Sequence, residues 1–154
     1  MTKTTQDGHV RIRPLCAADH DNWAELWNHY LAFYDIDLPQ DIYETTFERL
    51  IAEDQSRMQA NVAECDGEIV GLVHFILHDH CWRKGQVCYM QDLFTHPDHR
   101  GAGIGQALIE SVYADADRLG AESTYWLTQT FNERARKLYD RVAHVTAFIK
   151  YQRA

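Results

Sequence analysis

The sequence predicts a mixed α/β protein in which helices flank a single sheet. Apolar residues recur at helical spacing in two segments that follow a short N-terminal strand. An Asp66-Gly67 pair then joins two runs rich in β-branched residues, and a later strand leads through closely spaced glycines into a helix. The expected order is β-α-α-β-β-β-α-β-α-β, and residues 1–154 are expected to form one domain because no repeat or linker divides them.

The first half of the chain supplies a strand, two helices and a hairpin. Val10 to Pro14 alternate apolar and basic side chains, which is typical of a short edge strand. Residues 19–34 carry apolar side chains at helical spacing, and residues 39–51 begin with a proline that breaks this helix before a second amphipathic segment. Residues 59–65 and 68–77 are expected to pair, because Asp-Gly is a common hairpin turn.

The second half alternates strands with helices. Val87 to Thr95 is expected to be a strand, which a following proline ends. Ala107 to Leu119 shows helical spacing and is closed by a glycine. Ser123 to Gln129 is strand-like, Asn132 to Val142 is helical, and Val145 to Tyr151 is expected to form the final strand.

Composition excludes several classes of protein. The chain has 154 residues, of which 45% are hydrophobic and 25% charged, as is usual for one globular domain. No apolar run approaches the roughly 18 residues that cross a bilayer, and the N-terminus is polar, so we expect a cytoplasmic protein without a membrane partner. The net charge of −8 disfavours nucleic acid and mildly favours cationic ligands. The four cysteines are too scattered for a disulfide framework.

The turn from Arg100 to Gln106 is the most informative motif. Glycines at positions 101, 103 and 105 lack Cβ atoms, so backbone N–H groups at the start of a helix can approach an anion such as a phosphate or pyrophosphate. A Rossmann fingerprint requires G-x-G-x-x-G after the first strand, and a Walker A loop requires Gly-Lys-Ser/Thr where this chain has Gly105-Gln106. The remaining alternative is that the glycines only permit tight packing of helix against strand.

This turn resembles a signature of the GNAT acetyltransferases. Arg100-Gly101-Ala102-Gly103-Ile104-Gly105 matches R/Q-x-x-G-x-G/A at the expected place between a strand and a helix. Residues 132–139 look like the second landmark of the family, N-x-x-A-x-x-x-Y. The order of elements resembles the GNAT fold over nearly the whole chain. Through residues 89–94 the sequence looks most like the branch of the polyamine acetyltransferases and the small histone acetyltransferases.

The resemblance implies acetyl-CoA as co-substrate and no metal. The pyrophosphate is expected on the glycine turn, and backbone groups of the preceding strand are expected to hold the pantetheine arm. An amide at or near Leu93 would polarise the thioester carbonyl. The residues expected to bind the co-substrate are Leu93, Phe94, Thr95, Arg100, Gly101, Ala102, Gly103, Ile104, Gly105, Gln106, Asn132, Ala135 and Tyr139.

Three residues are candidates for the chemistry. The attacking amine must be neutral, yet a free alkylamine with a pKa of about 10.4 is mostly protonated at neutral pH. The resemblance places a carboxylate at the position of Gln91, whose amide cannot accept the proton, and Asp92 is the remaining carboxylate that could hold the amine or relay its proton. Tyr139 is expected to protonate the departing thiolate. The alternatives are a structural ion pair for Asp92 and a buried aromatic ring for Tyr139.

The acceptor pocket implied by the resemblance combines aromatic and acidic side chains. It is expected to include Phe33, Tyr34, Asp35, Trp82 and Asp92, which suit an organic cation. The acceptor would be a polyamine, an amino-acid-like metabolite, or a lysine of a basic peptide. Histidines and a cysteine near Trp82 do not recur in a zinc-type arrangement, so no metal is expected.

Two alternatives to acetyl transfer remain, and an assembly is expected. The missing carboxylate at Gln91 leaves open a module that senses acyl-CoA without turnover, and a transferase with a longer acyl donor is the other alternative. Relatives often pair through their terminal strands. The resemblance therefore implies a homodimer that uses the strand predicted at residues 145–151.

Overall fold

The computed structural model describes residues 9–54 and 57–154. These residues form one five-stranded sheet in the order β1-β2-β3-β4-β5, with all neighbours antiparallel except β4 and β5, so the predicted mixed α/β class is confirmed. In chain order the helices and strands are β1 (Val10–Pro14), α1 (His20–Phe33), α2 (Gln40–Ile51), β2 (Met58–Cys65), β3 (Glu68–His78), β4 (Val87–Thr95), α3 (Ile104–Arg118), β5 (Thr124–Tyr125) and α4 (Glu133–Val142). Short 3₁₀ turns, η1 (Ala17–Asp19) and η2 (Pro97–His99), precede α1 and follow β4.

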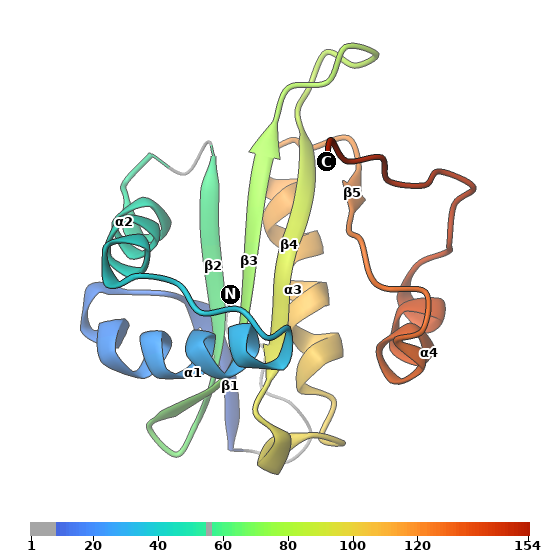
Figure 1. The fold of residues 1–154 in the computed structure, drawn as a ribbon. Coiled ribbons are helices and arrows are strands. Elements are labelled where there is room, and N and C mark those ends of the chain that lie inside the picture. Colours follow the sequence, from blue (N-terminus) through green and yellow to red (C-terminus); the bar gives the residue numbers. More distant parts are fainter. Residues whose placement is uncertain (1–8, 55–56) are drawn as a thin grey trace.

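Helices cover both faces of the sheet, which divides the core into two clusters. Helices α1 and α2 lie on one face and α3 lies on the other (Figure 1). Trp23, Trp27 and Phe47 anchor the cluster beneath α1 and α2, whereas Leu108 and Val112 anchor the cluster beneath α3. The central strands are therefore buried on both faces, which explains why β3 is an almost continuous apolar run. In the described part, no helix has both the length and the apolar character needed to cross a membrane.

A β-bulge in β4 decides which face its side chains occupy. His74 lies opposite Asp92 and Phe75 lies opposite Met90, so Gln91 has no partner on β3. Met90 packs in the cluster on the α3 side, whereas Asp92 accepts hydrogen bonds from side chains of α1. Under strict alternation Asp92 would share the face of Met90. The bulge therefore places the carboxylate under α1.

Strands β4 and β5 pair over a very short length. Cys88 lies opposite Thr124 and Tyr89 lies opposite Tyr125, and β5 ends there, so the strand predicted over residues 123–129 is much shorter than expected. Beyond Tyr89, the edge of β4 that faces β5 has no strand partner among the described residues. Its backbone N–H and C=O groups are therefore available to an extended ligand.

The predicted final strand at residues 145–151 is wrong. These residues form neither strand nor helix, and among them the side chain of Val145 is 74% exposed and that of Tyr151 is 90% exposed. No hydrogen bond joins residues 144–154 to the other residues that the structure describes. A β-rich composition forms a strand only where it pairs with an edge, and the chain after α4 turns back toward the upper end of β5 (Figure 1) without pairing with a described strand.

Candidate active site

The glycine turn forms an open cradle at the start of α3. Gly101 has a φ of 88° and Gly103 a φ of 77°, in the left-handed region that favours glycine. A Cβ atom built on either residue would meet nothing within 4 Å, so the turn faces open space. Gly103 is the N-cap of α3, and the first helical hydrogen bond runs from the N–H of Ala107 to its carbonyl. The preceding N–H groups are free at the positive end of the helix, which suits a phosphate.

Two arginines add positive charge beside this turn. Arg100 donates from Nε to the carbonyl of Thr95 at 3.2 Å, and its guanidinium lies 5.7 Å from the centroid of the Phe94 ring. Burial and the positive charge of Arg134, on α4, together lower the pKa of Arg100 below its ordinary value. An anion bound between Arg100 and Arg134 would offset the repulsion between their two positive charges, so this position favours an anion.

Gly105 has a different function from the other two glycines. A Cβ atom at this position would lie 3.1 Å from Cδ2 of Leu138, so the glycine allows α4 to approach α3. The hydroxyl of Tyr113 also ties α3 to α4 by donating to the carbonyl of Val142 at 3.0 Å. The packing alternative therefore applies to Gly105, while the left-handed glycines shape the turn itself.

A small cavity beside the open edge of β4 brings together several predicted residues. Its volume is about 30 Å³, and it lies between α1, β4, the segment after β5 and α4. It is lined by Tyr30, Tyr34, Met90, Gln91, Leu93, Trp126, Leu127, Thr128 and Tyr139. Four of the predicted residues, Tyr34, Gln91, Leu93 and Tyr139, therefore share one cavity.

Tyr139 is held in this cavity by aromatic packing. Its ring meets that of Trp126 edge-on, with centroids 5.3 Å apart and an interplanar angle of 71°. Burial, and to a lesser extent the nearby Tyr34 hydroxyl, raise the pKa of Tyr139 to about 12. The hydroxyl therefore keeps its proton over the neutral pH range and is available as a proton donor.

Asp92 lies behind the cavity rather than in its lining. Its Oδ2 atom is 2.8 Å from Nδ1 of His74 and 3.3 Å from Nε1 of Trp27, and its Oδ1 atom accepts from the Tyr30 hydroxyl at 3.0 Å. Burial by itself would raise the pKa of the Asp92 carboxyl, but the hydrogen bonds offset it and hold the pKa below its ordinary value. The carboxylate is therefore charged at neutral pH and contacts Tyr30, which lines the cavity.

The remaining predicted residues lie outside the cavity lining. Phe33 is 64% exposed at the end of α1, and Trp82 is 83% exposed in the loop between β3 and β4. Asp35 follows α1 with a left-handed φ of 56°. Asn132 precedes α4, and its amide is 3.4 Å from the Thr128 hydroxyl. Their assignment to substrate or co-substrate stays a prediction.

Sequence reasoning missed several residues that the structure brings to the site. Tyr30 and Trp126 line the cavity, His74 supports Asp92, and Arg134 lies close to Arg100. A partial signal existed for Tyr30, because it precedes Tyr34 by one helical turn and so shares its face of α1. Nothing local in the sequence identifies the other contacts, which join distant segments.

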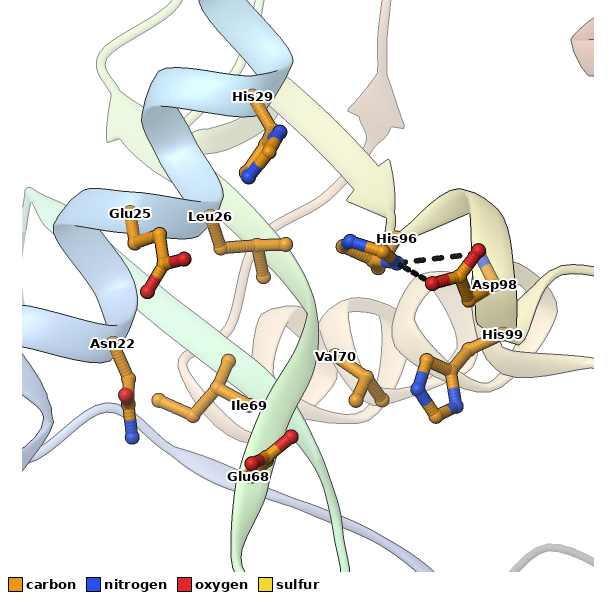
Figure 2. A pocket seen from close by; sticks show the side chains of 10 residues that line it. All are labelled: Asn22, Glu25, Leu26, His29, Glu68, Ile69, Val70, His96, Asp98 and His99. Carbon is orange, nitrogen blue, oxygen red and sulfur yellow. Dashed lines mark hydrogen bonds and ion pairs between the residues drawn. The ribbon is translucent and has the colours of Figure 1, made fainter.

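A larger cavity lies away from these residues. Its volume is about 320 Å³, and Figure 2 shows it between α1, the start of β3 and η2. The lining includes His29, His96 and His99, with Glu25 and Glu68, but none of the predicted site residues. Within residues 9–54 and 57–154, no group of three or more His, Cys, Asp or Glu side chains is arranged to hold a metal ion.

Comparison with known proteins gives consistent matches. The acetyltransferase (GNAT) family matches residues 23–144. The D-amino-acid N-acetyltransferase HPA3 of Saccharomyces cerevisiae is 35% identical over 145 residues, which cover 94% of this chain and 90% of the yeast protein. The ribosomal-protein-alanine N-acetyltransferase of Brucella melitensis has a similar structure, with a TM-score of 0.75 and 27% identity over 94% of this chain and 98% of its own. An aminoglycoside N-acetyltransferase, AAC(6')-Iy in complex with CoA, shares the fold at a TM-score of 0.83 and 18% identity, over 99% of this chain and 97% of its own.

Proposed function

From the premise that this chain belongs to the acetyltransferase (GNAT) family and is an acetyl-CoA-dependent N-acetyltransferase, we propose that it acetylates the primary amine of a small amino-acid-like metabolite. The observation that carries the proposal is the cavity that Tyr139, Gln91 and Leu93 line together beside the open edge of β4. Helix α3, which starts at the glycine turn, packs against α4 where Gly105 contacts Leu138, the neighbour of Tyr139.

The acceptor class is supported by the yeast relative, which is named for acetylation of D-amino acids and matches 94% of this chain. A polyamine or a lysine of a basic peptide remains the alternative that the sequence resemblance suggested. A longer acyl donor stays the alternative that the sequence left open. The cytoplasm stays the location predicted from sequence.

The proposed reaction is direct attack of a neutral amine on the thioester. The free backbone groups of β4 near Leu93 bind the pantetheine arm and polarise the thioester carbonyl, and Gly101, Gly103 and Arg100 hold the pyrophosphate. The nitrogen–carbon bond forms, the carbon–sulfur bond breaks, and the nitrogen loses one proton. Tyr139, whose pKa of about 12 keeps it protonated, donates its proton to the departing sulfur.

The test is release of CoA from acetyl-CoA in the presence of a panel of amines. The panel contains D- and L-amino acids, spermidine, an aminoglycoside and a histone-tail peptide. We expect turnover of amino acids, and we expect Tyr139→Phe to lower kcat by about 100-fold because the thiolate loses its proton donor. Tyr43→Phe is the matched control, since its hydroxyl donates to Asn28 Oδ1 at 3.1 Å and does not line the cavity. Absence of CoA release with every acceptor would contradict the proposal.

We also propose that two copies of the chain associate through residues 145–151. Val145, Phe148, Ile149 and Tyr151 are each at least 74% exposed, although their side chains are large and apolar. Soluble proteins rarely leave a contiguous apolar segment of this kind in water. Association of two copies would bury these apolar side chains, which is the physical reason for placing the interface here.

A further inference from the structure

The hydroxyl of Tyr30 lies between the cavity and the buried carboxylate of Asp92. Tyr30 lines the cavity together with Gln91 and Tyr139, and its hydroxyl is 3.0 Å from Asp92 Oδ1. Asp92 is only 9% exposed and does not line the cavity. Tyr30 both lines the cavity and hydrogen-bonds to Asp92, so it offers a direct path for a proton from the cavity to this carboxylate.

The direction of the hydrogen bonds in this network follows from Trp23. An indole N–H only donates, and Nε1 of Trp23 lies 2.9 Å from Nε2 of His74, so this ring nitrogen of His74 accepts. His74 is therefore neutral and carries its proton on Nδ1, which donates to Asp92 Oδ2 at 2.8 Å. Trp27 adds a second donor to the same oxygen at 3.3 Å. The Oδ2 atom of Asp92 therefore accepts two hydrogen bonds, one from His74 and one from Trp27.

The other oxygen of Asp92 orients the Tyr30 hydroxyl. An ionised carboxylate has no proton to give, so the Tyr30 O–H donates to Oδ1. Its oxygen can accept a proton donor on the cavity side, where the Tyr34 side chain also forms a hydrogen bond with Tyr30. Burial and the negative charge of Asp92 raise the pKa of Tyr30 far above its ordinary value. Tyr30 thus holds its proton at rest and cannot act as a free phenolate. The titratable groups near it are Tyr34, which caps the C-terminus of α1, Asp92 with His74 behind it, and Tyr139 on α4.

We propose that Tyr30 accepts the proton of the attacking amine and passes its own proton to Asp92. The proposal rests on the function proposed above and supplies the proton acceptor that Gln91 cannot be. As the nitrogen–carbon bond forms, the N–H proton moves to Tyr30 Oη and the Tyr30 proton moves to Asp92 Oδ1. The carbon–sulfur bond breaks and sulfur takes the Tyr139 proton. After release, Asp92 returns its proton through Tyr30 to water, and Tyr139 takes one from water.

The first test compares Tyr30→Phe with Tyr43→Phe. Both changes remove one hydroxyl hydrogen bond within the aromatic cluster beneath α1 and α2, but only Tyr30 lines the cavity. We expect Tyr30→Phe to lower kcat about 100-fold at pH 7 and to leave the KM for acetyl-CoA within about 3-fold of wild type. Tyr43→Phe is expected to keep its kcat. A Tyr30→Phe kcat within about 3-fold of wild type would overturn the proposal.

The pH profile distinguishes proton transfer from a structural effect. At pH 9.5 hydroxide and free amine are more abundant than at pH 7, so the variant depends less on a positioned acceptor. We expect the kcat deficit of Tyr30→Phe to shrink by about 10-fold between these pH values. A deficit that stays constant over this range would mean that Tyr30 only supports the local packing, and would refute the relay.

Asp92→Asn tests the second half of the relay. The amide oxygen can accept from His74 and Trp27, and its N–H group then donates to Tyr30, which forces the Tyr30 hydroxyl to turn its proton into the cavity. We expect this variant to lose as much activity as Tyr30→Phe, and the double variant to lose no more than either. Additive losses would contradict the relay.

The failure of the proposed function and the failure of the relay can be told apart. If the wild type acetylates no amine, the proposed function fails. If the wild type is active and Tyr30→Phe has the same activity, only the relay fails.

Discussion

Replacing Gly103 with alanine tests how the backbone of the glycine turn supports binding of acetyl-CoA. Gly103 has a φ of 77° and caps α3, and a Cβ atom on it would meet nothing within 4 Å. The substitution therefore adds no collision inside the protein. Its effect is limited to the cost of holding an alanine in the left-handed region.

That cost is about 1–2 kcal/mol for a residue with a Cβ atom. If the turn keeps its conformation, the free energy of unfolding falls by this amount. If the turn relaxes in the free protein, binding of acetyl-CoA must restore it, and the dissociation constant rises by about 5–30-fold. The two effects together should account for about 1–2 kcal/mol, however they are divided.

The assay combines urea unfolding with titration calorimetry of acetyl-CoA. Gly103→Asn should recover most of the loss, because asparagine tolerates the left-handed region better than alanine. Gly67→Ala is the matched control, since Gly67 has a φ of 85°, also has nothing within 4 Å of its Cβ position, and lies in the hairpin turn. It should cost stability by a similar amount and leave the affinity for acetyl-CoA unchanged.

Two results would refute this reasoning. One is an alanine variant in which neither the unfolding free energy nor the affinity changes. The other is an asparagine variant that binds as weakly as the alanine variant. This second result would mean that Gly103 is needed because the ligand approaches its Cα closely. Strain in φ would then not explain the weaker binding.

The remaining predictions concern stability in acid and the assembly. Hydrogen bonds from Arg13 at 2.7 and 2.8 Å, which outweigh burial, lower the pKa of Asp19 from 3.8 to about 2. Because the folded-state pKa is depressed, about 2 kcal/mol of stability is present above pH 4 and is lost as the pH falls toward 2. Urea unfolding of Asp19→Asn should lack this dependence, and an unchanged acid profile would contradict it. Replacing Phe148 and Ile149 with aspartate should yield monomers in sedimentation, whereas Lys150→Asp should not; a monomeric wild type would rule out the proposed dimer.

Features that depend on neighbouring residues were predictable from the sequence. The Asp66-Gly67 turn has positive φ at both residues, 49° and 85°, as the hairpin motif requires. Gly101 and Gly103 adopt the left-handed conformation just before α3, where the glycine spacing indicated a turn. The apolar spacing of α1 and α2 likewise corresponds to the face that each helix buries. In these cases the physical cause acts within a few residues.

Features that depend on distant segments were not predictable in this way. Gln91 has no partner on β3, and this bulge turns Asp92 to the α1 face of the sheet. Tyr30, which hydrogen-bonds the Asp92 carboxylate, is 62 positions away in sequence. Residues 145–151 have a β-rich composition but pair with no strand in the part of the chain that the structure describes. The sequence by itself determined the family signature, the turn that suits a phosphate and the order of most elements, because backbone conformation and amphipathic spacing are local. Only the tertiary structure decided which side chains surround the reacting amine, because register, bulges and side-chain contacts arise when separate segments pack together.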